Sequence, residues 1–117
     1  MPKLMIIDDD RAMTSLLKTL LEMEGFDVTV VPRGMQAIEK ASAEQPDAFI
    51  VDYHLTDMDG LEVVANLRNN AAFARTPIVM ASGLDVEKDA LSNGVDVFML
   101  KPFEPGDLAD VLSHLLS

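Results

Sequence analysis

Aspartates form two groups whose positions indicate metal and phosphate chemistry. Asp8, Asp9 and Asp10 are consecutive, and Asp52 directly follows the apolar run 48–51. One aspartate at such a place commonly caps the next helix, because its carboxylate accepts hydrogen bonds from backbone N–H groups. Two carboxylates about 4 Å apart, in contrast, repel each other by about 4 kcal/mol at an effective dielectric constant of about 20. Packing Asp8 and Asp9 against Asp52 is therefore costly unless a divalent cation binds there.

The available ligands favour magnesium as this cation. Mg2+ prefers oxygen ligands, uses few protein carboxylates and leaves room for a phosphate oxygen. Zinc sites use mainly cysteine and histidine, but the chain has no cysteine and only two histidines, His54 and His114. We interpret His54 as a loop side chain, because imidazole prefers transition metals. Its backbone carbonyl is the better candidate ligand.

Lys101 and Ser82 can both contact an anion bound near Asp52. A lysine by itself is most often a solvated surface charge, but Pro102 fixes the turn after Lys101 and can aim the ammonium group at an anion. Ser82 by itself is a typical strand-end cap. If Asp52 carries a phosphoryl group, the Ser82 hydroxyl can donate a hydrogen bond to this charged group, worth about 1.5–3 kcal/mol.

Five short apolar runs predict the strands that position these residues: 4–7, 28–31, 48–51, 78–80 and 95–100. The run 4–7 is continuous and lacks an alternation of polar and apolar residues, as expected for a strand that is covered on both faces.

Apolar residues with helical spacing separate the runs and follow the last one. The stretch 11–24 has the period of an amphipathic helix, and Gly25 is a natural stop. Weaker stretches begin at Gly34 and after Gly60, and Asp85 can cap a short helix that Gly94 ends. The apolar positions of the first and last helices are Met13, Leu16, Leu17, Leu20, Leu21, Leu108, Val111, Leu112, Leu115 and Leu116.

Five strands alternating with five helices predict a single α/β domain over residues 1–117. The sheet is expected to be parallel and doubly wound, because each return to a parallel strand requires a crossover. Ligands bind beyond the carboxyl ends of the strands in such sheets. Asp8, Asp52, Ser82 and Lys101 all follow predicted strands, so we expect them at one edge.

The whole chain resembles the receiver domain of two-component response regulators. The resemblance is carried by the motifs IIDDD, VDYHLTDMDG, MASG and FMLKPF. It implies a flavodoxin-like (βα)5 fold with strand order 2-1-3-4-5. It also implies a phosphorylation-dependent switch that takes its phosphoryl group from a histidine kinase or a phosphotransfer protein and signals to a downstream protein that the sequence does not identify.

The resemblance also implies roles for individual residues. Asp52 would accept the phosphoryl group, and Lys101 would contact the phosphoryl oxygens. Asp9, Asp52 and the backbone carbonyl of His54 would bind Mg2+, with Asp8 assisting through water.

The same resemblance makes Ser82 and Phe98 the switch residues. Ser82 would turn toward the phosphoryl group and Phe98 would move inward, which carries the signal to the face of the fourth helix, fifth strand and fifth helix. By residue type alone, Phe98 is also an ordinary buried strand residue.

Three departures from the family pattern stand out. Thr56 occupies a position where many receivers have proline, which suggests a less rigid loop after Asp52. Ser82 replaces the more frequent threonine and keeps the hydroxyl, while His54 and Leu84 occupy positions that tune phosphoryl lifetime in the family. No Lys or Arg follows Lys101, so a dimer through a basic last helix is not expected.

Two other functions remain as alternatives to the phosphorylation switch. A receiver with an intact pocket can signal by phosphorylation-independent docking alone. An aspartyl-phosphate hydrolase of the haloacid-dehalogenase kind also uses a strand-end aspartate, but it requires an acid where this chain has His54. We therefore do not expect an enzyme, beyond self-phosphorylation from small acyl phosphates and self-dephosphorylation.

Composition limits the partners and the location. The 117 residues include 9 Lys and Arg against 20 Asp and Glu, a net charge of −11, so direct binding to nucleic acid or to anionic membranes is not expected. The absence of cysteine excludes disulfides. The apolar run before Asp8 is too short for a signal peptide or a membrane span, which makes a cytoplasmic location the default expectation. The chain is expected to be either a single-domain receiver or a receiver excised from a longer protein.

Overall fold

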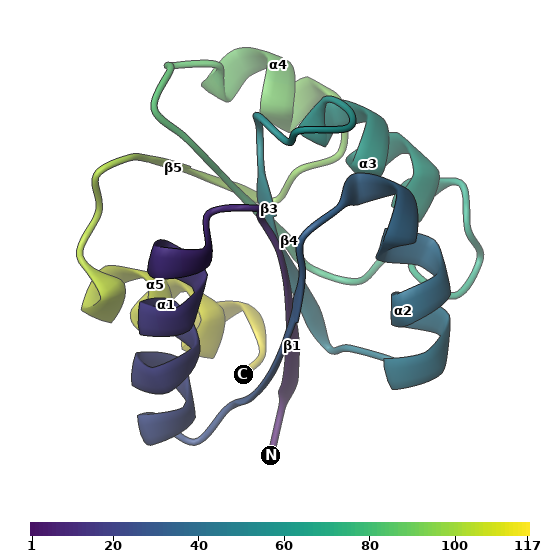
Figure 1. Cartoon of the computed structure of the whole chain (residues 1–117). Helices are drawn as coiled ribbons and strands as arrows, with labels where there is room; N and C mark the ends of the chain where they lie inside the picture. The colour runs from purple at the N-terminus through teal and green to yellow at the C-terminus, as the bar shows by residue number, and fades with distance from the viewer.

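A five-stranded parallel sheet with helices on both faces forms the protein, as the computed structural model of residues 1–117 shows (Figure 1). The strand order β2-β1-β3-β4-β5 confirms the predicted fold. The elements are β1 (Lys3–Ile7), α1 (Arg11–Met23), β2 (Asp27–Val31), η1 (Gly34–Gln36), α2 (Ala37–Glu44), β3 (Ala48–Asp52), α3 (Gly60–Arg68), β4 (Ile78–Ser82), α4 (Glu87–Ser92), β5 (Val97–Leu100) and α5 (Pro105–Leu115).

Alternate strand residues face opposite layers of helices, since side chains along a strand point to opposite faces. Leu4, Ile6 and Ile50 belong to a core cluster with buried residues of α1 and α5. Met5 and Ile7 belong to a second cluster with buried residues of α2, α3 and α4. Figure 1 shows these two layers on either side of the sheet. The run 4–7 lacks alternation because both of its faces are covered by helices.

The first helix uses a narrower buried face than its sequence predicts. Its fully buried residues are Thr14, Leu17 and Leu21, whereas the side chain of Leu16 is 55% exposed. Leu16 instead lines a groove beside Phe103. Leu16 is thus an apolar position of the helix that lies outside the core, because α1 rests on the sheet along residues three to four positions apart and Leu16 lies beside this line.

Two expected boundaries near α4 also need correction. Asp85 is not the N-cap, because α4 begins at Glu87 after Val86 and has no side-chain cap; Asp85 accepts a long hydrogen bond, 3.4 Å, from the Glu87 N–H. The last strand begins at Val97 rather than at Val95. The Val95 N–H still donates to the Ala90 carbonyl, 3.1 Å away, and so completes the end of α4.

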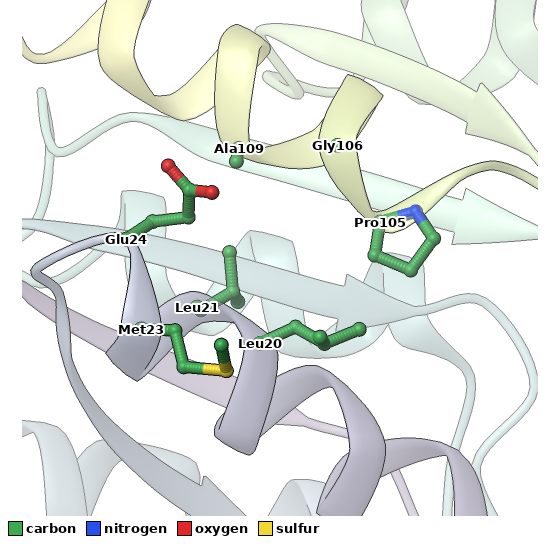
Figure 2. Close-up of a pocket in the computed structure, with 7 residues that line it drawn as sticks. All are labelled: Leu20, Leu21, Met23, Glu24, Pro105, Gly106 and Ala109. Atoms are coloured by element: carbon green, nitrogen blue, oxygen red, sulfur yellow. The ribbon is translucent and has the colours of Figure 1, made fainter.

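A shallow cavity lies between α1 and α5 (Figure 2). It has a volume of about 220 Å³ and is lined mainly by apolar side chains and by Pro105 and Gly106 at the start of α5. Glu24 is its one ionisable residue, so this cavity lacks the groups that phosphate chemistry requires.

Across the whole chain, no helix combines the length and the apolar character needed to cross a membrane.

Gly60 allows α3 to begin directly against the end of β3. A Cβ atom built on Gly60 would lie 2.8 Å from the Tyr53 Cα and closer still to the Asp52 carbonyl oxygen, whereas a Cβ on Gly106 in α5 meets no atom within 4 Å. We expect Gly60→Ala to lower the free energy of unfolding by about 1–3 kcal/mol. We expect Gly106→Ala, the matched control, to raise it by up to about 1 kcal/mol. Urea unfolding measures both, and equal effects of the two substitutions would contradict the close packing at Gly60.

Candidate functional site

Strand register brings Asp8, Asp52 and Lys101 together at the carboxyl edge of the sheet. Ile7 of β1 pairs with Val51 of β3, so the next residues, Asp8 and Asp52, are neighbours. Lys101 follows β5 and its N–H donates to the carbonyl of Ser82 at the end of β4, 2.7 Å away. The sequence expectation that these strand ends meet is confirmed.

Lys101 lies between the two carboxylates and compensates their charge. Its Nζ is 3.1 Å from Asp52 Oδ1 and 3.4 Å from Asp8 Oδ2. The side chains of Asp8 and Asp52 are only 4% and 12% exposed, respectively, so these pairs are less screened than surface ion pairs. The peptide bond between Lys101 and Pro102 is cis.

Asp8 is the residue most affected by this environment. Burial raises the pKa of its carboxyl group above the ordinary value, and the charge of Asp52 acts in the same direction. A hydrogen bond from the Asp10 N–H, 3.0 Å long, and the ammonium group of Lys101 oppose this rise in pKa. Because the pKa of Asp8 is raised overall, the ammonium group of Lys101 and the Asp10 N–H do not fully offset the effect of burial on this carboxyl group.

A third carboxylate, from Asp9, completes the acidic cluster. One oxygen each from Asp8, Asp9 and Asp52 can be chosen such that all three lie within 4.8 Å of one another. Oδ2 of Asp9 accepts hydrogen bonds from both the N–H of Thr56, 2.7 Å away, and the hydroxyl of Thr56. The structure thus brings together the three acids that the sequence singled out, and it adds Thr56 as a partner that sequence reasoning did not identify.

Asp10 and Asp57 have structural partners outside this cluster. Asp10 caps α1, where its side chain accepts a hydrogen bond of 3.1 Å from the Met13 N–H. Asp57 accepts hydrogen bonds from the N–H groups of Met35 and Gly34, at 2.9 and 3.0 Å, and these bonds lower its pKa. Asp57 therefore ties the loop after β3 to the start of η1, a contact between distant segments that no local sequence pattern indicates.

The loop after Asp52 leaves two oxygens without hydrogen-bond partners. No hydrogen bond ends on the His54 carbonyl or on Asp52 Oδ2. Every buried side-chain oxygen or nitrogen has a partner, so Asp52 Oδ2 must reach solvent. The imidazole of His54 instead stacks edge-on with Tyr53, with ring centroids 4.7 Å apart.

Ser82 ends β4, and Phe98 lies in the neighbouring strand β5. Phe98 pairs with Met80 in register, and both contribute to the core beneath α2, α3 and α4. Ser82 is 1% exposed, and its Oγ accepts a hydrogen bond of 3.0 Å from the Leu84 N–H. Its hydroxyl donates no hydrogen bond in the structure, so the proton is free for another acceptor.

Comparison with known proteins identifies the family. The sequence model of the family described as the response regulator receiver domain matches residues 4–113, nearly the whole chain. The chain belongs to the receiver domain family. Protein PilG of Pseudomonas aeruginosa is 33% identical over 109 residues, which cover 91% of this chain and 81% of that protein. The structure also matches chemotaxis response regulator CheY4 of Vibrio cholerae with a TM-score of 0.92 and 26% identity, covering 99% of both chains.

Several curated relatives of this receiver domain are longer proteins. The alkaline phosphatase synthesis transcriptional regulatory protein PhoP of Bacillus subtilis is 36% identical over 109 residues, which cover 91% of this chain but 45% of PhoP. The chain thus spans about half the length of the first curated relatives that it matches. It is a receiver domain of two-component response regulators, with the fold and the acidic strand ends described above.

The raised pKa of Asp8 predicts a specific dependence of stability on pH. The folded receiver retains a proton on Asp8 at pH values above 3.8, the ordinary pKa, where the unfolded chain has lost it. The contribution of Asp8 to stability therefore falls as pH rises from 3.8 through the higher pKa of the folded state. We expect Asp8→Asn, which lacks this titration, to gain stability relative to the wild type over that pH range.

Urea unfolding at a series of pH values, with a chelator present, measures this difference. Asp27→Asn is the matched control, because Asp27 is exposed in β2. A stability difference between Asp8→Asn and the wild type that shrinks as pH rises would contradict the assignment.

Proposed function

We propose that this receiver domain is a phosphorylation-dependent switch that accepts a phosphoryl group on Asp52. The observation that carries the proposal is the state of this carboxylate. Oδ1 of Asp52 is held by the ammonium group of Lys101 at 3.1 Å, while Oδ2 has no hydrogen-bond partner and reaches solvent. One oxygen is thereby oriented by a cation and the other is available as a nucleophile.

The proposed step transfers the phosphoryl group from a phosphohistidine of a histidine kinase or phosphotransfer protein. Asp52 Oδ2 attacks phosphorus, the bond between phosphorus and the imidazole nitrogen breaks, and the imidazole leaves with the electron pair. Phosphoryl transfer depends mainly on in-line positioning and charge stabilisation. Lys101 would contact the phosphoryl oxygens and stabilise their charge. Its Nζ can reach them, since it already lies within 3.4 Å of Asp8 Oδ2 and 3.1 Å of Asp52 Oδ1.

The acidic cluster fits Mg2+ as the cofactor. Three carboxylates offer oxygens within 4.8 Å of one another, and the cluster contains neither cysteine nor an imidazole ligand, which suits a hard cation. We propose Asp9, Asp52 and the free carbonyl of His54 as ligands, with Asp8 acting through water. A bound Mg2+ would neutralise charge on the phosphoryl oxygens as they approach the acids.

The signal would leave through the face made by α4, β5 and α5. Ser82 has a hydroxyl proton without an acceptor, and it would donate this proton in a hydrogen bond to the phosphoryl group, with Phe98 moving inward behind it. Leu84, Leu91 and Leu100 are 55%, 47% and 51% exposed, and they come from the loop after β4, from α4 and from β5. Exposed apolar groups on these elements support a protein as the downstream target.

A charge argument supports a protein target rather than nucleic acid. The chain carries a net charge of −11, which repels phosphate backbones. The domain changes its own state and is not proposed to turn over a separate substrate, beyond self-phosphorylation from small acyl phosphates and self-dephosphorylation.

Phosphoryl acceptance is testable by mass. After incubation with Mg2+ and acetyl phosphate, we expect the intact protein to gain one phosphoryl group, which Asp52→Asn abolishes because the nucleophile is lost. Intact-protein mass spectrometry measures the adduct, and Asp110→Asn, an exposed aspartate of α5, is the control that should retain it. An adduct that survives Asp52→Asn, or no adduct on the wild type, would refute the phosphoacceptor assignment.

Magnesium binding should also be visible in thermal unfolding. A ligand at 100 times its dissociation constant stabilises the folded state by about 2.7 kcal/mol, so we expect Mg2+ to raise the Tm of the wild type. The rise should be much smaller for Asp52→Asn, which loses a proposed ligand. Without metal, Asp52→Asn should melt above the wild type, because one of three crowded carboxylates is neutral. Differential scanning fluorimetry gives all four values, and an equal Mg2+ effect on both proteins would contradict the proposed site.

A further inference from the structure

Thr56 contacts the acidic cluster from the loop after β3. Both its backbone N–H, at 2.7 Å, and its hydroxyl donate to the same oxygen, Oδ2 of Asp9. The two residues are separated by 47 positions in the chain, so the contact exists only in the folded protein. An exposed threonine can satisfy both groups with water, yet here both groups converge on one carboxylate oxygen.

Asp9 has no other donor. Lys101 forms ion pairs with Asp8 and Asp52 but not with Asp9, and the hydrogen bonds to the Asp9 side chain all come from Thr56. Without these bonds the side chain is free to rotate among its staggered rotamers. Thr56 therefore determines where the Asp9 carboxylate lies.

The position held by Thr56 is compatible with metal binding. With both bonds to Oδ2 in place, the three acids still offer oxygens within 4.8 Å of one another. Oδ1 of Asp9 accepts no hydrogen bond and remains available as a ligand. Hydrogen bonds to the second oxygen of a ligating carboxylate fix its orientation, and loss of such outer partners typically costs about 10–100-fold in metal affinity.

We propose that Thr56 is a positioning residue that holds Asp9 as a magnesium ligand. The inference rests on the proposed magnesium site and goes beyond it, because it assigns part of the metal affinity to a residue that does not itself bind the metal. The hydroxyl is the part of Thr56 that substitution can remove, since the backbone N–H remains in any variant other than proline.

Magnesium titration of four proteins tests the proposal. Thr56→Val removes the hydroxyl and keeps the branched shape, while Thr56→Ser keeps the hydroxyl. Thr19→Val is the matched control, because the Thr19 hydroxyl is also exposed and bonded, but to the Ser15 carbonyl within α1. Tyr53 is a suitable fluorescent reporter, since it adjoins Asp52 and the chain has one tyrosine and no tryptophan.

We expect the Kd for Mg2+ to rise about 10-fold in Thr56→Val. Thr56→Ser and Thr19→Val should stay close to the wild type. The weaker Mg2+ binding of Thr56→Val should also appear as a smaller Mg2+-induced rise in its Tm. A melting transition is seen only for protein that is folded at the start, so this measurement also shows that the variant folds. A role of Thr56 in loop stability alone would lower the Tm of the metal-free protein and leave the Kd unchanged, which would overturn the proposal.

The remaining outcomes separate this inference from the magnesium site itself. Tighter binding by Thr56→Val would overturn the proposal, because it would show that Thr56 competes with the metal for Asp9. If the wild type shows no Mg2+ binding, both the metal site and the role of Thr56 are refuted. If the wild type binds Mg2+ and Thr56→Val binds it equally well, the metal site stands and the positioning role alone is refuted.

Discussion

Crowding of negative charge at the carboxyl edge of the sheet is the constraint on which the rest of the site depends. The parallel register of β1 and β3 makes Asp8 and Asp52 neighbours, and burial raises the pKa of Asp8. Three segments supply compensating groups: Lys101 after β5, the Asp10 N–H at the start of α1, and Thr56 in the loop after β3. Each of them is a hydrogen-bond donor, so cationic, N–H and O–H groups offset the repulsion between the carboxylates.

Because side chains alternate along a strand, Asp52 and Phe98 lie on different faces of the sheet. Asp52 continues the face of Ala48 and Ile50, which packs against α1 and α5. Phe98 belongs with Met80 on the face beneath α2, α3 and α4. Ser82, at the end of β4, is linked to the charged cluster through its carbonyl, which accepts a hydrogen bond from the Lys101 N–H.

The loop after β3 is held at three points. Gly60 packs against the Asp52 backbone, Asp57 binds the N–H groups at the start of η1, and Thr56 binds Asp9. The Gly60 N–H also donates to the Tyr53 carbonyl at 2.7 Å. Because of these contacts, the segment that carries the His54 carbonyl has a defined path beside Asp52, although it contains no regular helix or strand.

Local pattern in the chain was enough to place five strands and their order of appearance, because buried parallel strands must be continuous apolar runs and helices must repeat every 3.6 residues. It was also enough to bring Asp8, Asp52, Ser82 and Lys101 to one edge, since ligand groups in such sheets gather at the strands' carboxyl ends. The strand order came from family resemblance, because neighbouring strands are chosen by long-range packing. The late start of β5 was missed, and the apolar spacing of α1 did not indicate that Leu16 is exposed, for the same reason.

Side-chain partners across the site required the folded structure. The bonds from Thr56 to Asp9 and from Gly34 and Met35 to Asp57 join segments 47, 23 and 22 residues apart, and hydrogen bonds over such separations leave no periodic mark in a sequence. The pKa of Asp8 likewise depends on burial and on Lys101, 93 residues away. Residue types and spacing thus identified the candidate groups, while the hydrogen bonds that orient them and the burial that shifts the pKa of Asp8 arose when distant loops met at one edge of the sheet.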